Sequence, residues 1–229
     1  MKKKIVYTNA LIDYLSGFIT ENRLDKFNKI INLRTRFITI VLEDIYQPHN
    51  ASAVLRSCEC IGVQDVHIIE NKNKYEINPN ITLGSSKWLT LIRYNQIEYN
   101  TSNCIKNLKK TGYQIVATSS NLNGQSIEQI SVDKKIALFF GTEKDGVSND
   151  VIDNADCFVK IPMFGFTESF NISVSVAICL YSLTNRLRKS DIIWQLTEEE
   201  KSAIKLQWLK NSIKNANAIE SDFKKKFII

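Results

Sequence analysis

Three segments of this chain carry Asn, Ser, Glu or Arg at positions where a plain core would need apolar side chains. They are PHNASAVLRSCECIGV (48–63), FFGTEKDGVS (139–148) and IPMFGFTESFNISVSVA (161–177). Each segment joins a predicted strand or loop to a helix. Because loops held by regular elements are favoured places for binding and catalysis, the three segments predict a polar functional site.

The second segment directly follows an apolar strand. Gly141 lets a ligand approach the backbone closely, since glycine has no Cβ. Glu143 comes next, at the carboxyl edge of the predicted sheet, where open α/β sheets bind ligands. The alternative is a tight turn with a surface carboxylate, and the fragment alone favours that turn.

The third segment is harder to explain as packing. Ser169, Asn171 and Ser173 stand at the start of a predicted helix, and some of them are simply capping residues. Yet the polar stretch 167–171 forms an irregular loop between two apolar elements. We therefore interpret this loop as part of a site.

Familiar nucleotide, hydrolase and metal motifs are missing from the sequence. No G-x-G-x-x-G occurs among the eight glycines, which argues against a dinucleotide-binding domain. Gly141 and Gly146 have P-loop spacing, but no lysine follows them. With two histidines and no C-x-x-C among five cysteines, neither a Ser–His–Asp site, a metal site nor a disulfide framework is expected.

The middle of the chain alternates between strand and helix patterns. Strands are predicted at 37–43, 66–70, 113–119, 136–140 and 157–161. Helices are predicted from an N-cap at Asn50 to Ile61, and over 102–111, 148–154 and 170–189. Such alternation predicts an α/β fold with a mostly parallel sheet and helices on both faces.

The flanks have a different pattern. Positions 8–31 and 197–220 both read as helices, and Thr197 with Glu200 forms a capping box. We expect a helical N-terminal extension over 1–36, an α/β domain over 37–190 and a helical C-terminal extension over 191–229.

Charge and composition limit the partners. The net charge of +6 and the pI near 9.0 permit a polyanionic partner, and basic residues gather towards both ends. Solvated helix faces would give the same pattern, so this alternative stays open. No apolar run approaches the about 20 residues that span a bilayer, and no signal peptide is recognisable. Unpaired cysteines fit a reducing cytoplasm.

In order and spacing, the three segments resemble the signature motifs of the SPOUT-superfamily RNA 2′-O-methyltransferases, and most closely the TrmH-type tRNA (guanosine-2′-O)-methyltransferases. The resemblance covers nearly the whole chain. It implies a deep trefoil knot within about residues 136–180, a homodimer, and S-adenosylmethionine bound in the knot. By position it implies four cofactor contacts, at Thr118, Gly141, Ile161 and Phe170.

The same resemblance implies the reaction and its residues. Arg56 matches the catalytic arginine, and Asn50, Glu143, Ser169 and Asn171 match the other site positions. The reaction is in-line methyl transfer to a ribose 2′-hydroxyl, which must lose its proton during the step. A charged guanidinium has no acceptor, so phosphate clamping or stabilisation of the forming alkoxide suits Arg56 better than a literal base.

The RNA substrate is a finer question. The short basic lead and basic tail resemble the tRNA enzymes, whose target is the D-loop guanosine at tRNA position 18. Candidate phosphate contacts are Arg34, Arg36, Arg186 and Arg188. Ribosomal RNA methylation, and RNA binding on the same fold without catalysis, remain alternatives. Two positions depart from the family pattern: Glu168, where glutamine is frequent, and Asp145, where an aromatic residue is common.

Overall fold

The structure, a computed structural model, describes residues 2–96, 98–118 and 124–227. The chain divides into two compact units. The larger unit is Thr35–Trp194, and the smaller one combines Met1–Arg34 with Gln195–Ile229. The two terminal extensions therefore form one helical unit together.

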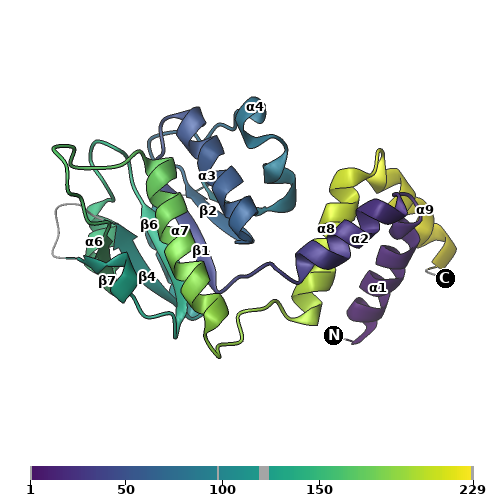
Figure 1. Cartoon of the computed structure of the whole chain (residues 1–229). Coiled ribbons are helices and arrows are strands. Elements are labelled where there is room, and N and C mark those ends of the chain that lie inside the picture. The colour runs from purple at the N-terminus through teal and green to yellow at the C-terminus, as the bar shows by residue number, and fades with distance from the viewer. Residues whose placement is uncertain (1, 97, 119–123, 228–229) are drawn as a thin grey trace. The chain divides into compact units, whose positions relative to one another are not determined.

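The larger unit is built on a seven-stranded parallel sheet (Figure 1). Its strand order is β3-β2-β1-β6-β4-β7-β5. The strands are β1 (Ile38–Glu43), β2 (Asp65–Ile69), β3 (Thr90–Tyr94), β4 (Tyr113–Thr118), β5 (Gln125–Ser126), β6 (Lys135–Phe140) and β7 (Cys157–Lys160). This confirms the α/β prediction with a parallel sheet.

Two of these strands were not predicted from the sequence. β3 has mostly half-exposed residues and pairs only with β2 among the named strands. β5 is two residues long. Short or half-exposed edge strands lack the continuous apolar run that marks a central parallel strand, so their pattern is weak. Residue 119, the last of one predicted strand, lies outside the described residues.

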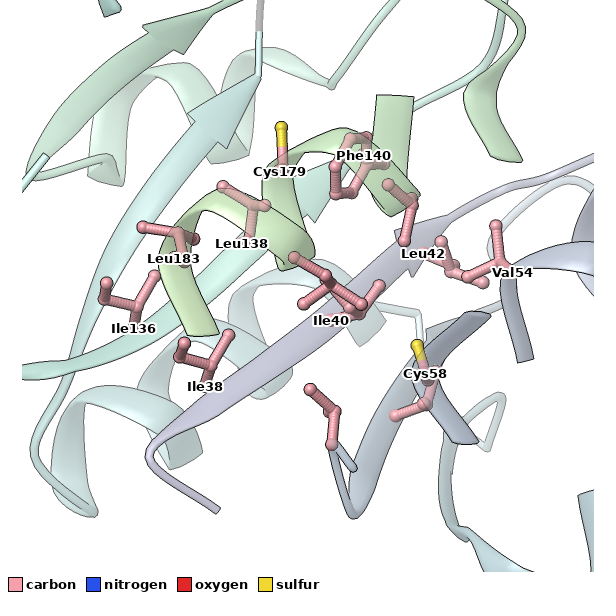
Figure 2. Close-up of a cluster of buried hydrophobic side chains, with 14 of the residues drawn as sticks. Ile38, Ile40, Leu42, Val54, Cys58, Ile136, Leu138, Phe140, Cys179 and Leu183 are labelled. Atoms are coloured by element: carbon pink, nitrogen blue, oxygen red, sulfur yellow. The ribbon is translucent and has the colours of Figure 1, made fainter. Parts of the chain in front are cut away.

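Helices cover both faces of the sheet. The elements are α3 (Pro48–Ile61), α4 (Pro79–Thr82), α5 (Asn100–Lys110), α6 (Asn149–Asn154) and α7 (Ile172–Lys189), with 3₁₀ turns η1 (Ser85–Trp88) and η2 (Ile127–Gln129). One face packs against α3 and α7: Ile40, Leu138, Val54 and Leu183 belong to the same buried cluster (Figure 2). The other face packs against α5 and α6 in a second cluster that includes Phe139.

The α3 helix begins earlier than predicted. Gln47 is its N-cap, Pro48 occupies the first turn and Gly62 ends it in a left-handed conformation. The prediction that Asn50 caps this helix is wrong, because Pro48 starts the helix before that position. Asn50 is consequently buried inside the first turn, with its side chain available for tertiary contacts.

The smaller unit contains four helices among the described residues: α1 (Lys2–Ser16), α2 (Glu21–Ile31), α8 (Glu198–Ser212) and α9 (Ala216–Phe227). The two predicted single helices are each broken in two. Thr20 caps α2 after a turn at Gly17, and Asn215 adopts a left-handed conformation before α9. The unit's core is aromatic, with the ring of Phe27 edge-on to Trp208.

His67 lies inside β2, buried and stacked on Tyr94. Burial lowers the pKa of its imidazole to about 4. The unfolded chain, with an ordinary histidine pKa, binds the proton first as the pH falls. Stability supplied by neutral His67 is therefore present above about pH 6.5 and is lost progressively towards pH 4.

We expect this single group to lower the free energy of unfolding by about 2 kcal/mol between pH 7 and pH 5. Urea denaturation at the two pH values, on the native chain and on His67→Gln, measures the contribution as the difference in pH dependence. His49→Gln, at an exposed position, is the matched control and should keep the native pH dependence. An unchanged pH dependence in His67→Gln would contradict the assignment.

Candidate active site

The side chain of Asn50 joins all three polar segments. Its amide nitrogen donates to a carboxylate oxygen of Glu143 and, over 3.2 Å, to Oε1 of Gln47. Its amide oxygen accepts from Nδ2 of Asn171 over 2.9 Å. The structure thus brings Asn50, Glu143 and Asn171 into one hydrogen-bonded cluster, which we call the Asn50 cluster.

Asn171 is held by its own helix. It is the N-cap of α7, and its Oδ1 accepts from the backbone N–H of Ser173 over 2.9 Å and from the Ser173 hydroxyl over 2.6 Å. The predicted capping role is therefore confirmed: Asn171 caps the helix with its oxygen, while its nitrogen contacts Asn50.

Glu143 is presented by a tight turn. The backbone groups of Thr142 and Gly146 exchange two hydrogen bonds of 3.0 Å, closing a short loop around the exposed Glu143 side chain. The turn inferred from the fragment GTEKDG is real, and it directs the carboxylate towards Asn50.

A cavity of about 430 Å³ adjoins the Asn50 cluster. The four residues that the resemblance proposes as cofactor contacts all line it, and so do Glu143, Glu168 and Ser169. Its wall combines the carboxyl ends of β4 and β6, the 141–147 turn, the loop after β7 and the first turns of α7. The lining mixes backbone-rich loops with apolar side chains, as small-molecule sites do.

Gly141 shapes this cavity. A Cβ at this position would lie 1.8 Å from the carbonyl oxygen of Gly146, so the turn closes only over a glycine. At the end of the neighbouring strand β4, the Thr118 hydroxyl donates to the carbonyl of Phe139 over 2.8 Å. Cys179 also lines the cavity, but burial raises the pKa of its thiol to about 12, so it is not a thiolate nucleophile at neutral pH.

These groups fit a cofactor with an apolar body and polar ends. The cavity volume lies within the range of cofactor sites, and the glycine lets a ligand reach backbone groups. Among the described residues, no group of three or more His, Cys, Asp or Glu could hold a metal ion. No helix in the described part of the chain is long and apolar enough to cross a bilayer.

Arg56 is not part of the Asn50 cluster. It is exposed on α3, and no ion pair or hydrogen bond joins it to Glu143 or Asn171 in the described part of the structure. At about 100° per residue, a position six residues along a helix faces a different side from Asn50. Within one chain, therefore, Arg56 and Asn50 lie on different sides of α3.

The four arginines predicted to bind phosphate have structural partners. Arg34 is 1% exposed and lies over the ring of Trp208. Arg36 pairs with Asp65 at 2.9 Å. Arg186 donates to the backbone carbonyls of Ile127 and Ile130, and Arg188 donates to the carbonyl of Ile61. Because Arg34 is enclosed, we leave it out of any RNA-binding surface.

The structural role of one polar residue at the carboxyl edge of the sheet was not predicted from the sequence. Glu43 ends β1 and is buried, where it accepts hydrogen bonds from Thr101 over 2.6 Å and from the N–H and hydroxyl of Ser148, both over 2.8 Å. The one sign of this role in the sequence is that Glu43, a charged residue, ends a mostly apolar strand. The partners that explain it are separated from it by up to 105 residues.

Comparison with known proteins now decides the family. Residues 37–181, more than half of the chain, match the SpoU rRNA Methylase family. The chain belongs to the SpoU rRNA methylase family. The match begins at β1 and ends within α7, so it contains the whole Asn50 cluster and every residue lining the cavity.

Within the SpoU family, similar proteins match along most of their length. The tRNA (guanosine(18)-2′-O)-methyltransferase of Borreliella burgdorferi is 49% identical over 92% of this chain and 94% of its own. The tRNA (guanosine(18)-2′-O)-methyltransferase of Thermus thermophilus is 30% identical over 76% of this chain and 87% of its own length. The crystal structure of the A. aeolicus TrmH/SpoU tRNA modifying enzyme matches with a TM-score of 0.75 and 30% sequence identity. The match covers 85% of this chain and 98% of that enzyme's chain.

The Gly141 turn gives a direct test of the cavity's construction. Gly141→Ala must displace backbone at Gly146, and we expect it to lower the free energy of unfolding by more than about 3 kcal/mol. Gly165→Ala is the matched control, because a Cβ there meets nothing within 4 Å. Chemical denaturation compares the two variants, and equal stabilities would show that the turn is not closed as described.

Proposed function

We propose that this chain transfers a methyl group from S-adenosylmethionine to the ribose 2′-hydroxyl of a guanosine in tRNA, at position 18 of the D-loop. The observation that carries this is the Asn50 cluster at the edge of a cofactor-sized cavity. The SpoU family match and the names of the Borreliella and Thermus relatives support the same activity and substrate.

The cavity would hold the cofactor between the 141–147 turn and the loop before α7. When bound, S-adenosylmethionine supplies an electrophilic methyl group on its sulfonium. Thr118, Gly141, Ile161 and Phe170 would surround it, and Gly141 leaves its backbone open to contact. Glu143 and Ser169 line the cavity, and Asn50 and Asn171 are linked to it through the hydrogen bond to Glu143.

The Asn50 cluster would position the attacking hydroxyl. Glu143 has oxygen atoms that can accept a hydrogen bond from a ribose hydroxyl, and Asn50 fixes the direction of that carboxylate. Asn171 fixes Asn50 in turn. A hydroxyl held in line with the methyl group loses little further freedom on reaching the transition state, which is how positioning accelerates such a step.

Arg56 would supply positive charge to the reacting nucleotide. An exposed arginine can clamp a phosphate through two parallel N–H bonds or stabilise a forming alkoxide. Since Arg56 makes no hydrogen bond or ion pair with the Asn50 cluster among the described residues of its own chain, a second copy of the chain would give it a site to act on. This fits the homodimer that the family resemblance implies.

An exposed apolar surface supports that homodimer. Phe164 and Phe166 are essentially fully exposed, and Phe170 before α7, with Val174 and Tyr181 on α7, are exposed as well. Soluble chains rarely leave several large apolar side chains together in water unless another protein or ligand covers them. We propose that this surface pairs with a second copy.

The order of the strands supports the trefoil knot. The chain leaves β6, passes β4 to form β7, and then returns through 161–171 to α7, which packs with α3. We propose that the knot lies within residues 136–180.

The smaller, helical unit would bind tRNA electrostatically. Its sequence ranges hold fourteen Lys and Arg against eight Asp and Glu, whereas Thr35–Trp194 holds sixteen of each. The whole net charge of +6 therefore belongs to the smaller unit. Because the larger unit is neutral, sequence-independent attraction to the phosphate backbone would come from the terminal helices.

Ribosomal RNA is the second candidate substrate, since the matching family is described by rRNA methylation. A non-catalytic RNA-binding role is a third, which the intact polar residues of the site disfavour. In each case, we place the action in the cytoplasm.

The first test is transfer of labelled methyl to purified tRNA, with nuclease mapping of the product. We expect 2′-O-methylguanosine at position 18 of the D-loop, because the Borreliella and Thermus relatives are named for that reaction and the cavity with the Asn50 cluster supports ribose methylation. A separate pool of ribosomal RNA is assayed beside it. Methylation of that pool alone would transfer the proposal to ribosomal RNA, and cofactor binding without any methylation would leave RNA binding.

Arg56 is tested by two substitutions. We expect both Arg56→Ala and Arg56→Lys to lower kcat by at least about 100-fold, because lysine cannot reproduce the planar, two-pronged guanidinium. Lys106→Ala, at an exposed position of α5, is the control and should retain full turnover. Near-normal turnover in Arg56→Lys would reject the bidentate role.

The terminal unit is tested through salt. Lys214→Ala with Lys226→Ala, both exposed and in the smaller unit, should weaken tRNA binding several-fold. The slope of log Kd against log salt should fall by about 1 for each phosphate that the variant no longer neutralises. The paired control, Lys106→Ala with Lys109→Ala, removes the same charge from exposed positions of α5 in the larger unit. Equal effects of the two pairs would contradict the assignment of binding to the terminal helices.

A further inference from the structure

A second cavity, of about 500 Å³, lies beside the first. Its lining combines the loop after β2, the start of α5 and the start of α6: Asn71, Lys72, Glu98, Tyr99, Asn100, Thr101, Asp145, Val147, Ser148, Asn149 and Asp150. Asp145 and Val147 line both cavities. The two cavities therefore share a wall at the turn that presents Glu143.

The floor of the second cavity is rigidly held. Buried Glu43 accepts hydrogen bonds from Thr101 and Ser148, and the Thr101 hydroxyl also accepts from Nδ2 of Asn71 over 2.8 Å. Three of the lining side chains are thus fixed around one carboxylate at the end of β1. A cavity whose polar groups are already oriented binds a ligand with little loss of conformational freedom.

The charged side chains that line the second cavity indicate which chemical groups it can bind. Three carboxylates, on Glu98, Asp145 and Asp150, stand against a single lysine, Lys72. A phosphate group would be repelled here, whereas a group presenting N–H donors would be attracted. Asp150 already accepts a hydrogen bond from Ser102 over 3.2 Å.

The carboxylate oxygens of Asp145 are available to accept hydrogen bonds from a ligand. Its backbone N–H donates to the Thr142 hydroxyl over 3.0 Å, which fixes the turn. Its carboxylate has no hydrogen-bond or ion-pair partner within the described ranges. A free carboxylate can accept two parallel N–H bonds, and of the four RNA bases guanine presents two adjacent donors, N1–H and N2–H, on one edge.

The rim of the cavity carries an aromatic ring. Tyr99 is 66% exposed, immediately before α5. Exposed aromatic rings beside polar pockets are how RNA-binding proteins hold unstacked bases, with the ring against the base and side chains on the Watson–Crick edge. Tyr99 and Asp145 thus offer the stacking and edge contacts that one base needs.

We propose that this second cavity binds the guanine base of the reacting nucleotide, with Asp145 on its N1–H and N2–H edge and Tyr99 against its face. This rests on the proposed function. Base and 2′-hydroxyl are joined through one ribose, so adjoining cavities with a common wall can hold the base and the methyl donor at once.

The test compares RNA carrying guanosine at the target position with RNA carrying inosine, which lacks the N2 amine. For the native chain we expect kcat/KM to favour guanosine by at least about tenfold. In Asp145→Ala the ratio should fall to about two or less, because the group that reads the amine is gone. Taking the ratio within each variant cancels any effect of Asp145 on the cofactor cavity.

Asp153→Ala, an exposed aspartate of α6 outside the lining, is the matched control and should keep the native ratio. Tyr99→Ala should raise the KM for tRNA about tenfold while leaving the Kd for S-adenosylmethionine unchanged, since Tyr99 does not line the first cavity. Equal use of guanosine and inosine by the native chain, or an unaltered ratio in Asp145→Ala, would overturn the proposal.

The same ratio is measured without the reaction, as the Kd for a short RNA hairpin with guanosine or inosine at the target position. If no RNA is methylated but binding still discriminates through Asp145, the proposed function fails and the guanine site stands. If methylation proceeds and neither ratio depends on Asp145, the guanine site alone fails.

Discussion

The site depends on one side chain, Asn50, that bonds to two segments far away in the sequence. Glu143 and Asn171 lie 93 and 121 residues from it. Both are exposed polar residues in loops, and of the two only Asn171 is also held by its own helix, through Ser173. Because an amide carries both a donor and an acceptor, one asparagine can orient a carboxylate with its nitrogen and an N-cap with its oxygen. The cavity wall and the start of α7 are thereby fixed relative to each other.

A buried carboxylate performs a similar task beneath the neighbouring cavity. Glu43 at the end of β1 holds the starts of α5 and α6 through Thr101 and Ser148. Parallel strands end at the same edge, so residues that follow different strands meet there. Glu43 and Asn50 together organise two adjoining cavities on that edge, one suited to a cofactor and one to a base, with Asp145 between them.

The net positive charge and the two cavities lie in different units of the chain. The larger unit holds both cavities and is neutral, while the smaller helical unit carries the net positive charge. The arginines of the larger unit that the sequence offered for phosphate binding are engaged with Asp65 or with backbone carbonyls. Guanidinium groups suit such multiple hydrogen bonds, which leaves exposed lysines as the more available groups for a polyanion.

The sequence by itself determined the α/β class, the five central strands and the polar loops, because apolar runs and glycine stops are local signals. The sequence did not predict β3, because the pairing of an edge strand depends on residues distant in the chain. It also did not predict that Arg34 is enclosed, because that depends on packing against Trp208, or that the first helix ends at Ser16. The family motifs supplied the site residues as separate positions. Only the tertiary structure showed that Asn50 joins Glu143 to Asn171, because these hydrogen-bond partners are brought together by the fold of the whole sheet.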